Sequence, residues 1–169
     1  MRNDFVKKIL LVALGVTLVT SSWTSRSNAH HGFQGRYDSS RLIYLQGTVR
    51  DVRWQAPHSI LVVQLPRSIN IPNTVRQARE LNQLGQNAAQ RLTISQNLLG
   101  TTQQVEFPPV GSMTQPLRDH LKPGDLIRLL VYRNCERPNQ LRVQFAQLQN
   151  GVTVVRPGTV QTEVSGCGR

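Results

Sequence analysis

The chain has 169 residues and carries 20 Lys and Arg against 9 Asp and Glu, for a formal net charge of +11. This length suits one domain with a real core, and the charge favours anionic partners such as phosphate, anionic glycans or a lipid surface. The basic residues are scattered rather than grouped in a block, which predicts a diffuse solvated surface and argues against a dedicated polycation tract.

The N-terminus has the pattern of a secretory signal peptide. Positive residues at Lys7 and Lys8 precede an uncharged apolar run over residues 9–19, and small residues stand at Ser27 and Ala29. The run is shorter than the ~20 residues that span a bilayer, which disfavours the alternative of a membrane anchor. We expect a signal peptide over 1–29 with His30 as the first mature residue, or an earlier cut near Ser22. The mature protein would be periplasmic or secreted without a transmembrane anchor, and nucleic acid is then not an expected partner.

An extended arm is expected over residues 30–40, followed by a β-hairpin that turns at residues 55–57. Gly47 and Thr48 interrupt the alternation of the first strand, which predicts a glycine bulge in a long curved strand. The second strand, residues 60–63, is a continuous aliphatic run, so we expect it to be buried on both faces.

A helix is predicted over residues 73–90, because apolar residues recur at three- and four-residue spacings. Thr74 and Gln77 resemble a capping box at its start. The stripe is thin, which indicates a surface helix inserted between strands.

The second half of the chain predicts more strands and one short helix. Short strands are expected at 91–95 and 104–107, and Pro116 could open a helix over 116–121. Strands at 126–132 and 141–148 follow, with a hairpin extension at 152–155 and a tail over 157–169.

This order predicts a mainly β fold: a small five-stranded, OB-like (oligonucleotide/oligosaccharide-binding) antiparallel barrel over 41–156, with an inserted helix and a short helix before the fourth strand. An open antiparallel sheet with one helix is the alternative. The predicted core consists of Leu45, Val49, Trp54, Leu61, Val63, Leu129, Val131, Val143 and Phe145.

No catalytic motif stands out. The sequence lacks a glycine-rich phosphate loop and a nucleophile elbow, and its acidic residues are dispersed, so we do not expect an enzyme. The two cysteines, Cys135 and Cys167, are an even pair in a chain predicted to be exported, and we expect a disulfide that ties the tail to the barrel.

The histidines are the candidate metal ligands. After cleavage, His30 would combine a free amine with its own imidazole and with that of His31, a donor set that suits copper(II). His58 lies at the first hairpin, four residues after Trp54, within reach of a folded-back arm. In the alternative interpretation, His30 and His31 are solvated surface residues and His58 bonds turn carbonyls.

These residues carry a resemblance. A signal peptide that ends in Ala29, His30 and His31, followed by Phe33, then Gly47-x-Val49, then Trp54-x-x-Pro57-His58, resembles a family of small exported bacterial proteins of unknown function. Many members have Asn where this chain has Ala56. The resemblance implies export and the fold, and it implies no reaction.

The sequence therefore favours an exported, non-catalytic binding module with an unknown ligand. Its expected site comprises His30, His31 and His58 as metal ligands, with Trp54 as a ligand-binding residue and copper as the candidate metal. The alternative is a structural or interaction protein of the envelope that binds anionic polymers through an arginine-rich surface.

Overall fold

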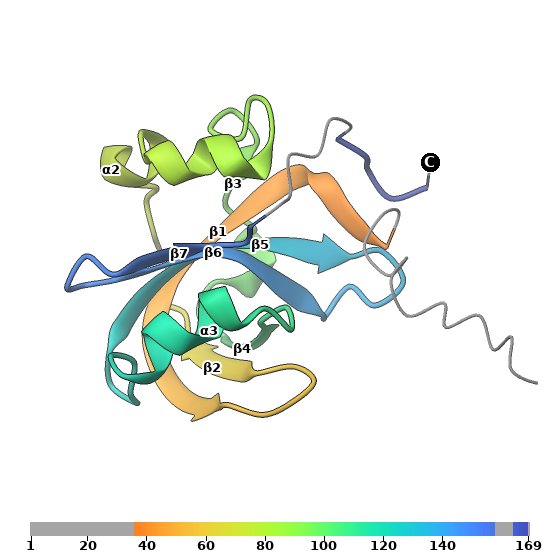
Figure 1. The fold of residues 1–169 in the computed structure, drawn as a ribbon. Coiled ribbons are helices and arrows are strands. Elements are labelled where there is room, and N and C mark those ends of the chain that lie inside the picture. Colours follow the sequence, from red (N-terminus) through yellow and green to blue (C-terminus); the bar gives the residue numbers. More distant parts are fainter. Residues whose placement is uncertain (1–35, 158–163, 169) are drawn as a thin grey trace, which may run out of the picture. The chain divides into compact units, whose positions relative to one another are not determined.

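The computed structural model describes residues 36–157 and 164–168 (Figure 1). The predicted signal peptide and the histidines His30 and His31 lie outside these residues. Within the described part, no helix is long and apolar enough to cross a membrane.

Five strands close into a barrel. Its members are β1 (Tyr37–Arg53), β2 (Ile60–Gln64), β4 (Thr102–Glu106), β5 (Leu126–Asn134) and β6 (Leu141–Leu148). They follow the order β2-β4-β6-β5-β1, and a β1–β2 pairing closes the ring. This is the predicted OB-like topology, except that the barrel is mixed. The β5–β6 hairpin returns the chain beside β4 in a parallel direction, so the purely antiparallel arrangement is wrong at that pair.

The first strand bends because it serves two neighbours. Thr48 belongs both to the ladder with β5 and to the ladder with β2. At Gly47 a Cβ atom would stand 2.3 Å from the carbonyl oxygen of Gln64, so only glycine fits at this close approach. The break in register with β2 lies between Val49 and Asp51, beyond the bulge predicted at Gly47 and Thr48.

The inside of the barrel is an apolar core. Along β2, Leu61 and Val63 are buried while the residues between and beside them are half-buried, so the expectation of burial on both faces is wrong. The barrel-facing residues of the strands are Ile43, Leu45, Val49, Leu61, Val63, Val105, Ile127, Leu129, Val131, Leu141, Val143, Ala146 and Leu148.

One helix adds side chains to this core. Helix α3 (Gly111–Arg118) is labelled in Figure 1. It contributes Met113 and Leu117 to the core. It begins five residues before Pro116, which lies inside it rather than at its start. The sequence does not predict this start, because the N-cap residue is Val110, which has no side-chain acceptor for a capping hydrogen bond.

The predicted 73–90 helix is two short pieces. An α-helical turn, α2 (Asn73–Arg76), is followed by a 3-10 segment, η2 (Arg79–Leu84). The extended backbone of Ala78 separates them. The N-cap of α2 is Pro72 without a side-chain bond, so the capping box is absent. The apolar stripe is nevertheless buried, since Leu81 and Leu84 are 3% and 1% exposed.

These pieces cover the outside of the barrel, where a second set of buried residues lies. Strand β3 (Leu92–Thr93) pairs with β1 at Leu42 and Ile43 and ties the segment down, and the 3-10 turn η3 (Gln96–Leu98) follows. We call this set the outer layer. It comprises Leu42, Tyr44, Leu130, Tyr132 and Phe145 from the barrel strands and Val75, Leu81, Leu84, Ala88 and Leu92 from residues 73–93.

Two predicted core residues are placed differently. The β5–β6 register moves from Leu130–Phe145 to Val131–Val143, which leaves Gln144 as an extra residue and turns Phe145 to the outer layer. Trp54 follows the end of β1 and is only partly buried against the core.

The chain ends are paired to the sheet. Tyr37 already pairs with Asn134, so residues 37–40 of the predicted arm belong to β1. Strand β7 (Thr153–Val155) extends the β6 hairpin as predicted. In the tail, the amide of Ser39 donates to the carbonyl of Ser165 at 2.9 Å.

Candidate functional site

A buried carboxylate organises the end of the barrel near the first hairpin. Glu106, the last residue of β4, is 8% exposed. Its Oε1 lies 2.9 Å from Nη2 of Arg142 and 3.1 Å from Nδ1 of His58. Its Oε2 accepts a hydrogen bond of 2.5 Å from the Nε2 of Gln140. Three neighbours therefore fix this carboxylate, and we call the set the Glu106 cluster.

The topology explains why these residues meet. The parallel β4–β6 ladder places Glu106 opposite Arg142. The β2–β4 ladder places Glu106 opposite Ile60, two residues after His58. Residues that are distant in the sequence thus converge where three strands end or begin.

His58 is oriented by the cluster. Its Nδ1 is buried and faces Glu106 without well-aligned hydrogen-bond geometry, while 35% of the side chain remains exposed. The exposure therefore falls on the rest of the ring, which includes Nε2. Such an arrangement presents one imidazole nitrogen to a ligand and holds the other against a carboxylate.

The cluster continues to the start of β1. The guanidinium of Arg142 lies 5.1 Å from the centre of the Tyr37 ring. The pKa of Arg156 is lowered, mainly by burial and secondly by the positive charge of Arg142. The amide of Cys135 donates to the carbonyl of Arg36 at 2.8 Å, so the chain enters the sheet beside the β5–β6 hairpin that also supplies Gln140.

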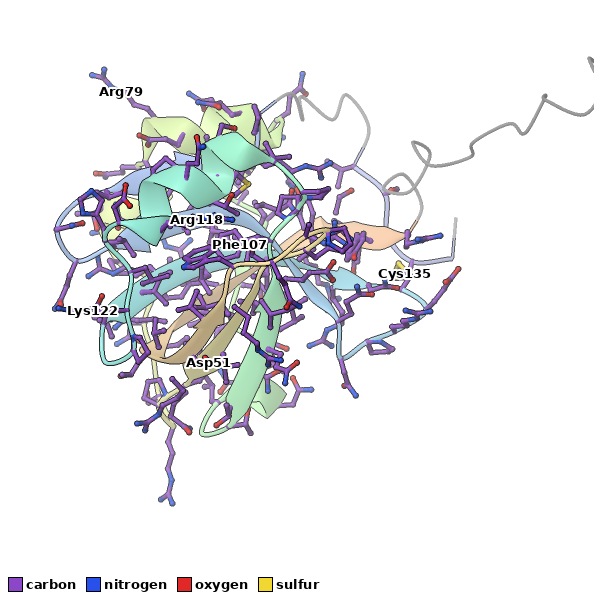
Figure 2. All side chains as sticks on the ribbon, turned by 60° about the horizontal axis from the view of Figure 1, so that its bottom comes forward. Asp51, Arg79, Phe107, Arg118, Lys122 and Cys135 are labelled. Atoms are coloured by element: carbon purple, nitrogen blue, oxygen red, sulfur yellow. A yellow bond between two sulfur atoms is a disulfide. The ribbon has the colours of Figure 1, made fainter. Side chains whose placement is uncertain are left out.

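Trp54 occupies a neighbouring position rather than the cluster itself. Its ring centre lies 6.0 Å from that of Phe107, and the guanidinium of Arg118 stands 5.8 Å from the Trp54 ring centre. Figure 2 labels these two neighbours, Phe107 and Arg118. A cation above an indole ring is a favourable arrangement. No described interaction links Trp54 to His58, so the structure leaves its predicted ligand-binding role untested.

The predicted disulfide is present. Cys135 in the β5–β6 hairpin and Cys167 in the tail are bonded, with a Cα–Cα distance of 5.3 Å. Asn134 orders the same hairpin by accepting hydrogen bonds from the amides of Glu136 and Arg137. The bond therefore fixes the tail to the hairpin beside the Glu106 cluster.

Only one of the three predicted metal ligands lies within the described residues. His58 is described, whereas His30 and His31 lie outside the described residues. Among residues 36–157 and 164–168, no group of three or more His, Cys, Asp or Glu side chains could hold a metal ion. A site at His58 would need donors from elsewhere.

Sequence reasoning missed Glu106, Gln140 and Arg142. Glu106 looked like one of several dispersed acidic residues in a short strand. Two features of the sequence could have indicated this cluster. Glu106 ends a strand just before Pro108 and Pro109, and Arg142 stands near the start of the alternating strand 141–148. Recognising it required the parallel pairing of two distant strands.

Comparisons with known proteins add one family and one solved structure. No curated protein matches the sequence significantly. The crystal structure of the ZRD-deleted mutant of TiaS in complex with agmatine matches at a TM-score of 0.34 and 10% identity. That match covers 70% of this chain and 25% of the other, so the chain spans about a quarter of its length. The model of a family of unknown function, DUF6152, matches residues 18–107, which is more than half of the sequence, and the chain belongs to this family.

Proposed function

We propose that the protein is an exported, non-catalytic binding module that takes copper(II) through His30, His31 and His58. The contact between Nδ1 of His58 and Glu106 carries the proposal. Histidines that ligate metals commonly direct their second ring nitrogen to a carboxylate, which fixes the tautomer and raises the basicity of the ligating nitrogen. Glu106 is itself held by Arg142 and Gln140, so the orientation of His58 is built into the barrel.

The route of the chain supports the participation of the N-terminal histidines. Contacts run from the Tyr37 ring to Arg142, from Arg142 to Glu106 and from Glu106 to His58. Tyr37 follows His31 by six positions in the sequence, and six extended residues span about 20 Å. That length is sufficient for an arm to return to His58.

The chemistry of the donors sets the pH dependence. A mature chain that begins at His30 would offer an amine with a pKa of about 7.7–8.0 and up to three imidazoles. Copper(II) favours nitrogen donors in a square arrangement and must displace protons from them. We therefore expect the affinity to rise between about pH 5 and 8.

The test is a calorimetric titration of correctly processed protein with copper(II). Mass spectrometry first establishes that the exported chain begins at His30. An Ala29-extended form should bind at least about tenfold more weakly, because it loses the geometry of the terminal amine and the first imidazole. His58→Ala should weaken binding by a smaller factor.

His120→Ala is the matched control, because His120 is exposed, follows α3 and is not among the described partners of Glu106. It should bind as the parent protein does. Equal affinities for the parent, the extended form and His58→Ala would remove the copper site and leave adventitious binding by exposed histidines.

A further inference from the structure

A cleft beside the Glu106 cluster has the features of an anion site. It has a volume of about 270 Å³ and opens between the 54–59 loop on one side and the 108–118 segment on the other. The last described hydrogen bond between the two sides joins the amide of Phe107 to the carbonyl of Ser59. Pro57, Pro108 and Pro109 lie beyond it and have no N–H, so the ladder cannot continue and the two segments separate.

The lining of the cleft carries positive charge only. Arg118 is the only charged residue among the ten that line it. No ion pair joins Arg118 to an acidic side chain in residues 36–157 and 164–168. Its guanidinium stands over Trp54, which positions a planar cation at the edge of the cleft.

Polar donors complete the lining. Ser59 lines the cleft and is 6% exposed, and no hydrogen bond of its hydroxyl is described within residues 36–157 and 164–168. Its Oγ is not one of the fully enclosed unpaired atoms, so the hydroxyl is open to the cleft and can bond a ligand there. Gly111 also lines the cleft and begins α3, whose N-terminus has neither a side-chain cap nor an acidic residue in its first turn. The amide of Met113 donates to the carbonyl of Val110. No hydrogen bond is described for the amides of Gly111 and Ser112, and free amides at the start of a helix favour an anion.

We propose that this cleft binds the carboxylate of a small organic acid. A guanidinium offers two parallel donors that match a carboxylate, and a single cation balances a single negative charge. The three prolines form an apolar wall suited to the body of such a ligand. Gly111 leaves room for it, since a Cβ there would meet nothing within 4 Å. His58 is not among the residues that line the cleft, although its neighbours Pro57 and Ser59 are.

The experiment is an NMR titration of the processed protein with benzoate in metal-free buffer. The amide signals of Ser59, Gly111 and Ser112 should shift and saturate. Benzamide, a neutral analogue of similar shape, should bind at least about tenfold more weakly. Inorganic phosphate should also bind more weakly, because it lacks an apolar body.

Variants separate the site from general electrostatics. Arg118→Gln should weaken benzoate binding about tenfold or more, Arg118→Lys by less, and Ser59→Ala about three- to tenfold. Arg76→Gln removes the same charge from the exposed last turn of α2 and should have no effect.

Three results would overturn the proposal. These are equal losses in Arg118→Gln and Arg76→Gln, binding of benzamide as tight as that of benzoate, or shifts that avoid the cleft. Phosphate binding tighter than benzoate would replace the carboxylate assignment. Because the buffer contains no metal, each result is independent of the copper titration.

Discussion

The inside of the barrel and the outer layer are both fully buried, but they are built from different residues. The barrel interior is lined almost entirely by aliphatic side chains, with Phe107 and Met113. The outer layer includes two tyrosines, Tyr44 and Tyr132, and it borders the guanidinium of Arg91. The interior is sealed by the closure of the strands themselves, whereas the outer layer is buried because residues 73–93 cover it.

Arg91 shows how that cover is attached. Its Nη2 donates to the carbonyl of Leu84 at 2.7 Å, and its Nη1 contacts the carbonyl of Ser39 and the hydroxyl of Tyr132. The Arg91 carbonyl accepts from the amide of Leu42 at 2.9 Å. The cover is therefore held by a few polar contacts in addition to packing. We therefore expect a destabilising substitution inside the barrel to unfold the whole domain, and one beneath the cover to increase opening only locally.

The largest expected effect is inside. Val131 is 0% exposed and pairs with Ile43 and Val143, so Val131→Asp would bury an unpaired carboxylate. That cost is comparable with the 5–15 kcal/mol that stabilise a typical domain. We expect no cooperative thermal transition by circular dichroism.

Gln104→Asp is the control, because it places the same charge at an exposed position of β4. It should melt cooperatively and close to the parent protein. A normal melt of Val131→Asp would mean that β5 does not line the interior.

A smaller effect is expected in the outer layer. Leu84 is 1% exposed beneath the cover, and Leu84→Ala should lower the free energy of unfolding by about 2–5 kcal/mol. By hydrogen exchange, the amide of Leu42 should exchange faster, because its acceptor is Arg91. Amides of the β5–β6 ladder should remain protected.

Asn82→Ala, at an exposed position of the same 3-10 segment, should leave both measurements unchanged. Uniform acceleration across the whole barrel in Leu84→Ala would show that the cover and the interior unfold as one unit.

The comparison also explains how much could be predicted. The interior followed from strand alternation, which correctly selected residues such as Leu45, Leu129 and Val143. Alternation gave the wrong face for Phe145, because the extra residue Gln144 in β6 turns the following side chains to the opposite face of the sheet. Nothing in the local sequence indicates this extra residue. The apolar stripe over 73–90 correctly predicted burial but overestimated the length of the helix, because the extended backbone of Ala78 and the positive φ of Gly85 interrupt it.

The site was predicted less completely than the fold. His58 could be selected from its hairpin, and the cysteine pair from the expectation of export. Glu106 and Arg142 meet only through a parallel pairing of strands 35 or more residues apart in the sequence. The charged edge of the cleft could not be predicted from the sequence, because it arises from the tertiary contact between Arg118 and Trp54.

The smallest predicted effect tests the polar character of the outer layer through pH. Tyr44 is 0% exposed, and its hydroxyl donates to Oε1 of Gln46 at 2.6 Å. Burial raises the pKa of Tyr44 to about 12, although the nearby charge of Arg128 opposes the shift. In the unfolded chain the pKa is about 10, so the folded state binds this proton more tightly.

The sign follows from linkage. The contribution of Tyr44 is fully present below about pH 10 and is lost as the pH rises from about 10 to about 12, by about 3 kcal/mol. Urea unfolding at a series of pH values should show this decline in the parent protein. Tyr44→Phe has no proton to lose, so its free energy of unfolding should fall less steeply over the same interval, while it is lower at pH 7 by about the value of one hydrogen bond. Absorbance at 295 nm should show one tyrosine fewer ionising near pH 12 in the variant. An identical alkaline slope in the two proteins would place Tyr44 in contact with solvent and would remove the distinction between a covered outer layer and an open surface.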